Sequence, residues 1–219
     1  MKSICVWRAA VLLCVILSQE LASAQTEVSG TQNGTWTLEN SPYVLVGDVF
    51  VNAPDTLTID PGVVVLADGY HRITVEGGEL VAVGTPEAPI MMTAMNQTQG
   101  WGGIRLFGAS DESRFEYCTF EYAKNFGPNL ESRGGAIRIE QCSPTIRFNE
   151  FRHNSSHNDN FNGGGGAVYV HLSSAIVANN IMFTNSADNG GAIRAGDLGT
   201  PIIRGTHLVG NIAHLGGGV

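Results

Sequence analysis

The sequence predicts an all-β protein: a right-handed, single-stranded parallel β-helix, or solenoid, that follows a signal peptide. Three observations indicate this class. The 219 residues include 28 glycines and only 15% charged residues. Hydrophobic and polar residues alternate over short runs, and two sequence blocks recur along the second half of the chain. Alternation with a period of two is typical of half-buried strands, whereas no stretch shows ten residues with helical periodicity.

The amino-terminal segment, residues 1–24, has the layout of a secretory signal peptide. Positive charges precede a short apolar core at residues 9–17, and residues 22–24 form a small-residue cleavage site. The apolar core is too short to span a bilayer, which requires about 20 residues. We therefore expect cleavage before Gln25 and export of the mature chain. No second segment of the sequence is long and apolar enough to span a membrane.

The charge of the mature chain excludes one class of partner. Without residues 1–24 the sequence has 10 basic and 19 acidic side chains. Nucleic-acid binding requires a basic surface, so we predict no nucleic-acid partner. Two cysteines remain, Cys118 and Cys142, and export permits a disulfide. Because they occupy different places in the repeats described below, we expect free buried thiols.

A Gly-rich tetrad marks the repeat. Its copies lie at residues 134–137, 165–168, 190–193 and 216–219, with a looser copy at 101–104. A period near 25 residues is typical of solenoids, in which each coil packs on the next. We expect coils of three short strands and three turns, stacked about 4.8 Å apart. The extra length of one repeat falls at residues 155–162, which we interpret as a polar loop.

A second block of eleven residues lies between the tetrads. Its copies are residues 113–123, 144–154, 175–185 and 201–211. The aligned blocks share two apolar columns, which we expect to form buried stacks in the core. The first column contains Phe115, Ile146, Val177 and Ile203, and the second contains Phe120, Phe151, Met182 and Leu208.

Asparagine also recurs at fixed places in this block. Asn149 aligns with Asn180, and three of the four copies end in Asn154, Asn185 and Asn211. Asn tolerates the left-handed backbone of a tight corner, and stacked amides can hydrogen-bond along the solenoid axis. We therefore expect Asn ladders at the corners. The paired glycines of the tetrad predict another corner, where positive φ or close approach of coils excludes a side chain.

The Gly-Gly-Ala-Ile tetrads and the Phe151-x-x-Asn154 spacing resemble the GGAI and FxxN repeats of chlamydial polymorphic outer-membrane proteins. They are also similar to the wider set of secreted bacterial parallel β-helix proteins, the pectin-lyase-like superfamily. Residues 57–62 and 80–85 look like the first coils of such proteins. The resemblance covers residues 36–219, and it implies the fold and secretion.

Three segments follow from this organisation. They are a signal peptide over residues 1–24, amino-terminal coils of the β-helix over 25–100 and regular repeats over 101–219. The chain stops at Val219, directly after its fourth tetrad. Solenoids normally cover their last coil with a cap, because bare strand edges promote aggregation. We therefore expect the chain to be an amino-terminal fragment of a longer protein.

The resemblance implies where to look for chemistry, namely the outer face of one parallel sheet. Lyases with this fold use clustered carboxylates that hold Ca²⁺ together with an Arg or Lys base, and the hydrolases use closely placed Asp residues. The outward position of the tetrad strand shows no such cluster. It reads instead Arg105, Arg138, Tyr169 and Arg194, so we predict no catalytic residues there.

Two interpretations of this column stay open. In the first, the arginines bind carboxylate or sulfate groups of a glycan, because Arg suits planar anions, and Tyr169 stacks on a sugar ring. In the second, which we favour, the arginines pair with acids such as Glu140 and Asp197 and keep the sheet soluble.

Metal-binding residue types gather near the polar loop, where His153, His157 and Asp159 fall within seven residues. Zinc requires three or four such ligands in good geometry, and Ca²⁺ requires more acids than this loop has. We therefore predict a solvated loop and no metal or other cofactor. The remaining histidines are scattered, without an acid or nucleophile at a spacing that indicates a catalytic triad.

The resulting functional hypothesis is a non-catalytic extracellular or cell-surface β-helix module, adhesin-like or a structural stalk. Its partner would be polysaccharide or the surface of a host or neighbouring cell. The module would be secreted, or held at the outer membrane by a carboxy-terminal anchor. The alternative is the amino-terminal part of a polysaccharide lyase or glycoside hydrolase whose catalytic coils lie beyond Val219. A purely structural spacer without a ligand is a third hypothesis.

Overall fold

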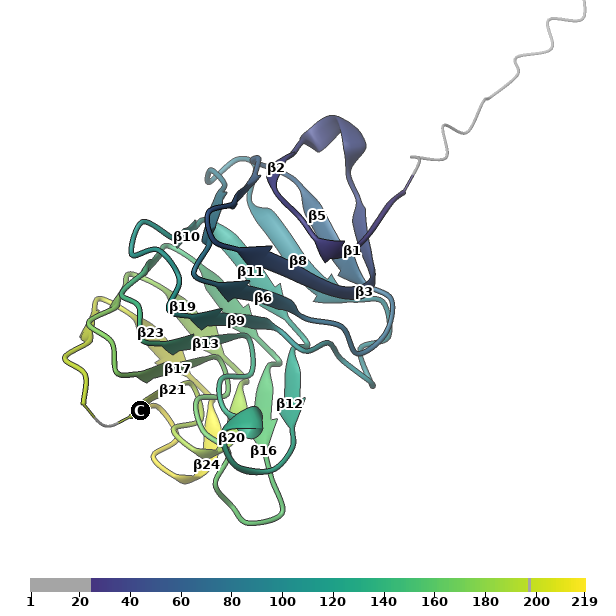
Figure 1. Ribbon diagram of the computed structural model, residues 1–219. Helices are drawn as coiled ribbons and strands as arrows, with labels where there is room; N and C mark the ends of the chain where they lie inside the picture. The colour runs from purple at the N-terminus through teal and green to yellow at the C-terminus, as the bar shows by residue number, and fades with distance from the viewer. Residues whose placement is uncertain (1–24, 197) are drawn as a thin grey trace, which may run out of the picture.

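The protein forms a parallel β-helix, which confirms the predicted fold class (Figure 1). The structure, a computed structural model, describes residues 25–196 and 198–219, so the predicted signal peptide lies outside the described residues. Strands of successive coils pair in parallel. Two 3₁₀ turns interrupt the strands, η1 (Leu38–Asn40) and η2 (Asn129–Ser132).

The largest sheet has 13 strands and forms two faces of the solenoid. One arm contains β6 (Ile73–Glu76), β9 (Ile104–Phe107), β13 (Ile137–Glu140), β17 (Val168–His171) and β21 (Ile193–Ala195). The other arm contains β5 (Val64–Ala67), β8 (Ile90–Ala94), β11 (Cys118–Glu121), β15 (Glu150–Arg152), β19 (Ile181–Phe183) and β23 (His207–Val209). The two arms meet at the long strand β3 (Tyr43–Asn52), which pairs with both β5 and β6 and also with β1 (Thr26–Thr31).

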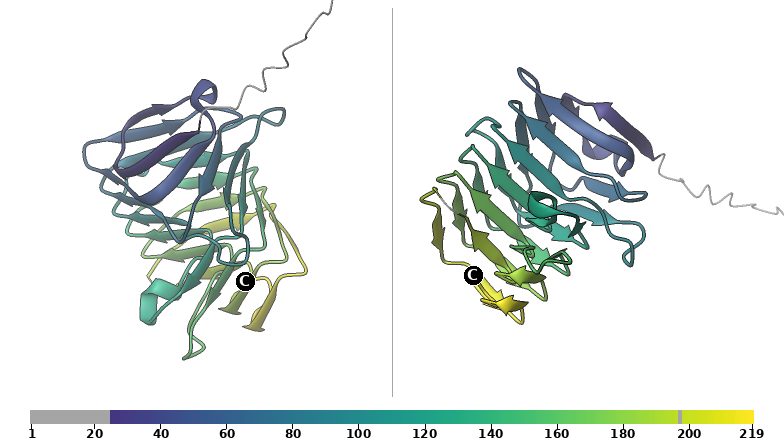
Figure 2. Two further views of the ribbon diagram at one scale, coloured as in Figure 1. Left: turned by 90° about the vertical axis from the view of Figure 1, so that its right-hand side faces the viewer. Right: turned by 60° about the horizontal axis from the view of Figure 1, so that its bottom comes forward.

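Two further sheets complete the coils (Figure 2). The seven-stranded sheet contains β2 (Gly34–Trp36), β4 (Thr56–Ile59), β7 (Glu79–Val83), β10 (Arg114–Glu116), β14 (Thr145–Arg147), β18 (Ile176–Ala178) and β22 (Ile202–Arg204). The four-stranded sheet contains β12 (Lys124–Phe126), β16 (Ser155–His157), β20 (Ser186–Asn189) and β24 (Ile212–Leu215).

The four-stranded sheet corrects the predicted coil. Over residues 101–219 each coil has four strands, one in each arm of the large sheet and one in each smaller sheet, where the sequence predicted three. The segment interpreted as a polar loop begins with strand β16, and only residues 158–162 form the excursion. Short runs such as Ser-Ser-His carry too little hydrophobic alternation to be recognised as strands.

The predicted core columns are confirmed. Ile146 pairs in register with Val177, and Val177 with Ile203. Phe120 and Phe151 pair in the second column, with their rings stacked 4.8 Å apart between centroids. Their side chains are buried, except in the last described coil, where Ile203 and Leu208 are only partly buried. Like side chains therefore stack on like along the solenoid axis.

The Asn ladders are also confirmed, although their backbone explanation was wrong. Asn149 donates from its backbone N–H and from Nδ2 to Oδ1 of Asn180, at 2.9 and 3.1 Å. Asn154, Asn185 and Asn211 make the same chain of contacts. The left-handed backbone belongs to the residue before each Asn: Phe148, Asn179, His153, Thr184 and Gly210. The residue before each Asn therefore makes the turn, and the Asn side chain provides the hydrogen bonds to the adjacent coil.

The tetrad glycines are required for both predicted reasons. Gly165 has φ +69°, a conformation that an L side chain rarely adopts. A Cβ on Gly166 would lie 2.2 Å from the carbonyl oxygen of Gly191 on the next coil. Glycine is therefore the residue that lets successive coils approach at this corner.

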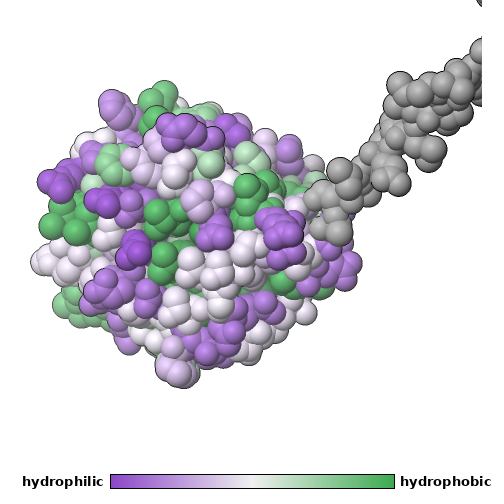
Figure 3. All heavy atoms as spheres, turned by 90° about the horizontal axis from the view of Figure 1, so that it is seen from above, coloured by the Kyte–Doolittle hydropathy of each residue, from purple (hydrophilic) through white to green (hydrophobic). Residues whose placement is uncertain are grey.

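The two ends of the solenoid differ in surface character. At the amino-terminal end, hydrophobic and hydrophilic residues are interspersed (Figure 3). In the last described coil, large apolar side chains are exposed on the three outer strands. They are Ile202, Val209, Ile212 and Leu215.

Candidate anion-binding groove

The predicted arginine column stands in register on one arm of the large sheet. Arg105 of β9 pairs with Arg138 of β13, Arg138 with Tyr169 of β17, and Tyr169 with Arg194 of β21. Thr74 of β6 extends the column by one coil. A second column lies two residues further along the same strands and contains Glu76, Phe107, Glu140 and His171.

The column is not the solvated face that the sequence suggested. Arg105 is only 6% exposed and Tyr169 only 1%. The segment that contains η2 explains the burial at Tyr169, because Arg133 lies over its ring at 5.2 Å and donates from Nη1 to Oη at 2.6 Å. The ring face that was expected to meet a sugar therefore carries a guanidinium. Arg194 donates to the carbonyl oxygen of Asn162 at 3.1 Å.

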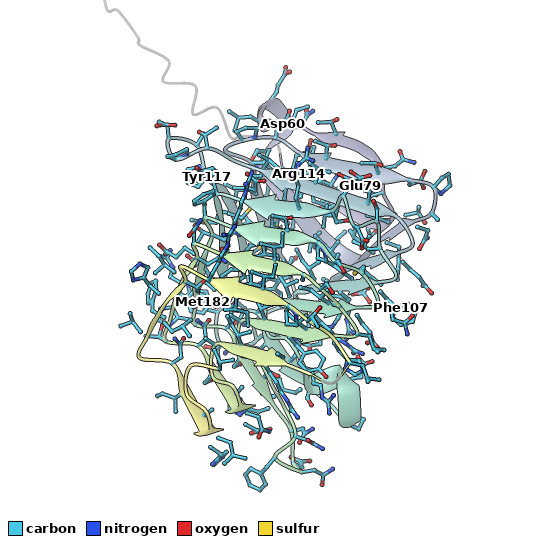
Figure 4. The ribbon with its side chains drawn as sticks, turned by 90° about the vertical axis from the view of Figure 1, so that its left-hand side faces the viewer. Asp60, Glu79, Phe107, Arg114, Tyr117 and Met182 are labelled. Carbon is cyan, nitrogen blue, oxygen red and sulfur yellow. The ribbon has the colours of Figure 1, made fainter. Side chains whose placement is uncertain are left out.

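A groove of about 270 Å³ opens at the other end of the column. Its lining combines three arginines with three glutamates and a few apolar or neutral groups. The residues are Arg72, Thr74, Glu76, Arg105, Leu106, Phe107, Glu131, Arg138 and Glu140. In Figure 4, Phe107 lies at the edge of the sheet opposite to the corner that carries Tyr117, so the groove is separate from that corner.

Two of the three arginines are paired with acids of the groove. Arg72 Nη1 lies 3.1 Å from Glu131 Oε2, and Arg138 forms an ion pair with Glu140. Burial opposes ionisation of Glu131, but the hydrogen bond and charge of Arg72 outweigh it and lower the pKa of that carboxyl. The predicted pairing of Arg138 with Glu140 is therefore confirmed, whereas Asp197 lies outside the described residues.

Arg105 differs from its neighbours. Its Nη1 donates to the carbonyl oxygens of Gly134 and Ile104, at 3.0 and 3.3 Å. Its Nε and Nη2 are buried and have no hydrogen-bond partner among the described residues. Burial, followed by the positive charges of Arg72 and Arg138, lowers the pKa of Arg105 to about 9. A buried donor without a partner is energetically costly, so this guanidinium is poised to bind an acceptor.

Sequence reasoning missed four groups of this groove: Arg72, Glu76, Phe107 and Glu131. Glu76 and Phe107 could have been found, because they lie two positions after the arginine column on strands of known register. Arg72 and Glu131 lie in connecting segments, whose path over the sheet no repeat pattern specifies. Arg194 was predicted with the column but does not line the groove.

The three residues considered as metal ligands do not converge. His153 stacks on Tyr122 at 5.2 Å and its Nδ1 lies 3.1 Å from Thr184 Oγ1, whereas His157 contacts Asp188 of the next coil. Asp159 is exposed. Within residues 25–196 and 198–219, no three His, Cys, Asp or Glu side chains are grouped so that they could hold a metal ion.

The two cysteines are free and buried, as predicted. Burial raises the pKa of the Cys118 thiol far above its ordinary value and that of Cys142 to about 11. Both are therefore protonated at neutral pH, and because the thiolate is the reactive form, neither is a nucleophile.

The stacked coils and the parallel pairing of their strands define a parallel β-helix protein. Residues 30–138 match the family model described as a pectate-lyase like beta helix domain. Together with the parallel strands of the curled sheets, this match supports a pectin-lyase-like parallel β-helix protein. Comparisons with curated proteins and with solved structures give no significant match. The similarity to chlamydial outer-membrane proteins stays a prediction. Among the described residues, no helix is long and apolar enough to cross a membrane.

Proposed function

We propose that the protein is an exported β-helix module that binds acidic glycans in the groove over β6, β9 and β13. The observation that carries this proposal is the buried Arg105 guanidinium, whose Nε and Nη2 have no partner among the described residues. These two nitrogens form one edge of the guanidinium. A planar carboxylate or sulfate can accept both hydrogen bonds at once, which is the geometry that Arg favours.

The surrounding charges support an anionic ligand. Arg72 and Arg138 add positive charge beside Arg105, and the acids that pair with them are Glu131 and Glu140. The Glu131 side chain is about half exposed. An incoming carboxylate therefore competes with Glu131 for Arg72. Phe107 is exposed at the edge of the groove and offers an apolar face to a sugar ring.

The proposed location follows from the sequence. The layout of residues 1–24 supports export, and an exported protein meets polysaccharide at a cell surface or in the extracellular medium. In this proposal the module is an adhesin-like or stalk-like element, secreted or held at the surface, that uses the groove for binding.

Retention on immobilised polygalacturonate tests the proposal. We expect the wild type to be retained at low salt and released as salt rises, because ionic contacts are screened. Arg105→Gln should abolish retention. Arg147→Gln is the matched control, since it removes the same charge from the seven-stranded sheet, where Arg147 pairs with Glu116 at 3.0 Å. Equal retention of the Arg105→Gln variant and the wild type would contradict the proposal.

A second candidate, a polysaccharide lyase, is favoured by one observation. The lowered pKa of Arg105 is a property that a catalytic base needs, and Glu76, Glu131 and Glu140 line the same groove. The calcium site of such lyases does not fit, because these acids form no metal-binding group in the described chain. Incubation with polygalacturonate, followed by ultraviolet detection of unsaturated products, separates the two candidates. Products that disappear with Arg105→Gln would establish the lyase.

A further inference from the structure

A second polar cluster lies on the four-stranded sheet, away from the arginine groove. His157 ends β16, and Ser186 and Asp188 lie on the adjacent strand β20. His157 Nδ1 is 2.9 Å from Asp188 Oδ1, and His157 Nε2 is 3.1 Å from Ser186 Oγ. The order serine, imidazole, carboxylate, with one ring nitrogen toward each partner, is the arrangement that activates a serine nucleophile.

Asp188 is held firmly in this cluster. Its side chain is almost completely buried, and Oδ2 accepts hydrogen bonds from the backbone N–H groups of Asn158 and Gly163, at 2.9 and 2.8 Å. Burial alone raises the pKa of Asp188, but the hydrogen bonds from His157 and the two backbone donors outweigh it, so the pKa is lowered. An ionised Asp188 favours the His157 tautomer with the proton on Nδ1. That tautomer leaves Nε2 to accept from the Ser186 hydroxyl.

The serine and the imidazole are accessible to a ligand. Both line a surface cavity of about 520 Å³, together with Lys124, Gln97 and Tyr122. Lys124 precedes Ser155 and Ser186 in one stacked column of the sheet, and its Nζ donates to the carbonyl oxygen of Thr98 at 2.7 Å. Lys124 therefore adds a positive charge to the cavity that also contains the serine.

We propose that Ser186, His157 and Asp188 form a nucleophilic site that hydrolyses small acyl esters, such as acetyl groups on a sugar. Ser186 Oγ attacks the ester carbonyl carbon while His157 Nε2 takes the hydroxyl proton. The carbonyl oxygen becomes an oxyanion in a cavity whose lining includes Lys124. The C–O bond to the alcohol then breaks, and the leaving oxygen receives the proton from Nε2. The products of this half-reaction are the free alcohol and an acyl-serine.

Water completes the cycle. His157 Nε2 takes a proton from water as the water oxygen attacks the acyl carbon. Collapse of the second tetrahedral species breaks the bond to Ser186 Oγ, which recovers its proton from Nε2. The acid is released and the site returns to its starting state, without any oxidant, reductant or metal ion.

A purely structural role explains only part of this geometry. Asp188 closes the excursion at residues 158–162 through its contacts with Asn158 and Gly163. Those contacts need neither the imidazole nor the serine. Two contacts remain, one between His157 Nδ1 and Asp188 Oδ1 and one between His157 Nε2 and Ser186 Oγ, and both Ser186 and His157 line the cavity. The proposal assigns the contact between Nε2 and Oγ to chemistry.

Covalent labelling with a fluorophosphonate probe tests the site, with peptide mass spectrometry to locate the label. We expect the wild type to be labelled at Ser186 and to show a burst with p-nitrophenyl acetate. His157→Gln should slow labelling by about 10²–10⁴-fold, the usual contribution of a general base. Ser186→Ala should remove the label altogether.

Ser155→Ala is the matched control, because Ser155 lies in the same column and the same cavity, whereas the His157 ring nitrogens hydrogen-bond to Asp188 and Ser186. It should be labelled at the wild-type rate. Circular dichroism of each variant shows whether the coil is intact. Wild type that takes up no label at Ser186, or ester hydrolysis that persists unchanged in Ser186→Ala, would overturn the proposal.

Discussion

The Asn ladder and the arginine column are two polar columns of the same solenoid, and they differ in how they satisfy hydrogen bonds. Asn180 donates from Nδ2 to the carbonyl oxygen of Ile146 at 3.0 Å, and its Oδ1 accepts from Asn149. Arg105 is buried to a similar degree, yet two of its nitrogens have no partner in the described chain.

The difference follows from the chemistry of the two side chains. An amide both donates and accepts, so identical amides stacked at the coil spacing satisfy one another. A guanidinium only donates, so stacked arginines depend on acceptors from elsewhere. Arg138 pairs with the carboxylate of Glu140, and Arg194 donates to the carbonyl oxygen of Asn162. Arg105 has too few acceptors, because its Nε and Nη2 have none among the described residues. We expect the self-sufficient column to stabilise the fold, and the column with unsatisfied donors marks the binding site that we propose.

The largest effect on stability is expected from Asn180→Ala. The substitution leaves the buried backbone N–H of Asn149 without its acceptor and removes one of the two acceptors of Asn149 Nδ2, which keeps the carbonyl oxygen of Phe115 at 2.8 Å. Each buried unsatisfied group costs about 1–3 kcal/mol, so we expect the free energy of unfolding to fall by at least that amount. Urea unfolding gives the value.

The matched control for the ladder is Asn160→Ala, at an exposed position of the 158–162 excursion. Its free energy of unfolding should match that of the wild type. If Asn180→Ala proved as harmless as this control, the ladder would be a consequence of the coil spacing and would not stabilise it.

The columns could be predicted from the sequence because the spacing of the repeats defines the register. Ile137 and Val168 are 31 residues apart, and so are Asn149 and Asn180. In a parallel solenoid, equal offsets place residues at the same position of adjacent coils. The core, the ladder and the arginine column all follow from that one rule.

The same offset of 31 residues relates two members of the proposed nucleophilic site, but the sequence analysis did not pair them. His157 and Asp188 are also 31 residues apart. A predicted loop over residues 155–162 removed β16 from the register, so the pairing with β20 could not be expected. The prediction of the groove was incomplete for another reason. Glu131 lies in η2, and the path of such a connecting segment depends on packing that no periodic pattern specifies.

Arg105→Met should change the free energy of unfolding in the opposite direction to Asn180→Ala, or leave it level. It removes a buried charge with unpaired donors, and the carbonyl oxygen of Gly134 keeps the Asn125 amide as a donor at 2.6 Å. Replacement of such a group by an apolar side chain of similar size is neutral or stabilising. We expect the free energy of unfolding to stay level or to rise by about 1 kcal/mol, while retention on polygalacturonate is lost.

Arg152→Met provides a comparison for this test, because the guanidinium of Arg152 is hydrogen-bonded to two glutamates. Its Nε lies 2.8 Å from Glu121 Oε1, and Nη1 lies 2.7 Å from Glu150 Oε1. The substitution leaves Glu121 buried without its cation, which should cost about 1–3 kcal/mol. A loss of stability in Arg105→Met equal to that in Arg152→Met would mean that Arg105 is also a structural residue.

The smallest effect is expected at Asp188 of the proposed nucleophilic site. Like the Asn ladder, its carboxylate has hydrogen-bond partners for both oxygens. The pKa of Asp188 is lowered in the folded protein, so the ionised carboxylate contributes stability that is fully present above the unfolded pKa of about 3.9. That contribution is lost as pH falls through the lower, folded value. Asp188→Asn, which keeps the shape, removes this dependence.

We therefore expect the difference in unfolding midpoint between the wild type and Asp188→Asn to shrink as pH falls below about 4. Other carboxylates titrate in both proteins and cancel in the comparison. A difference that does not change with pH would show that the contacts to Asn158 and Gly163 do not depend on the charge. Asp188 would then only close the excursion, and nothing would fix the His157 tautomer that the nucleophilic site requires.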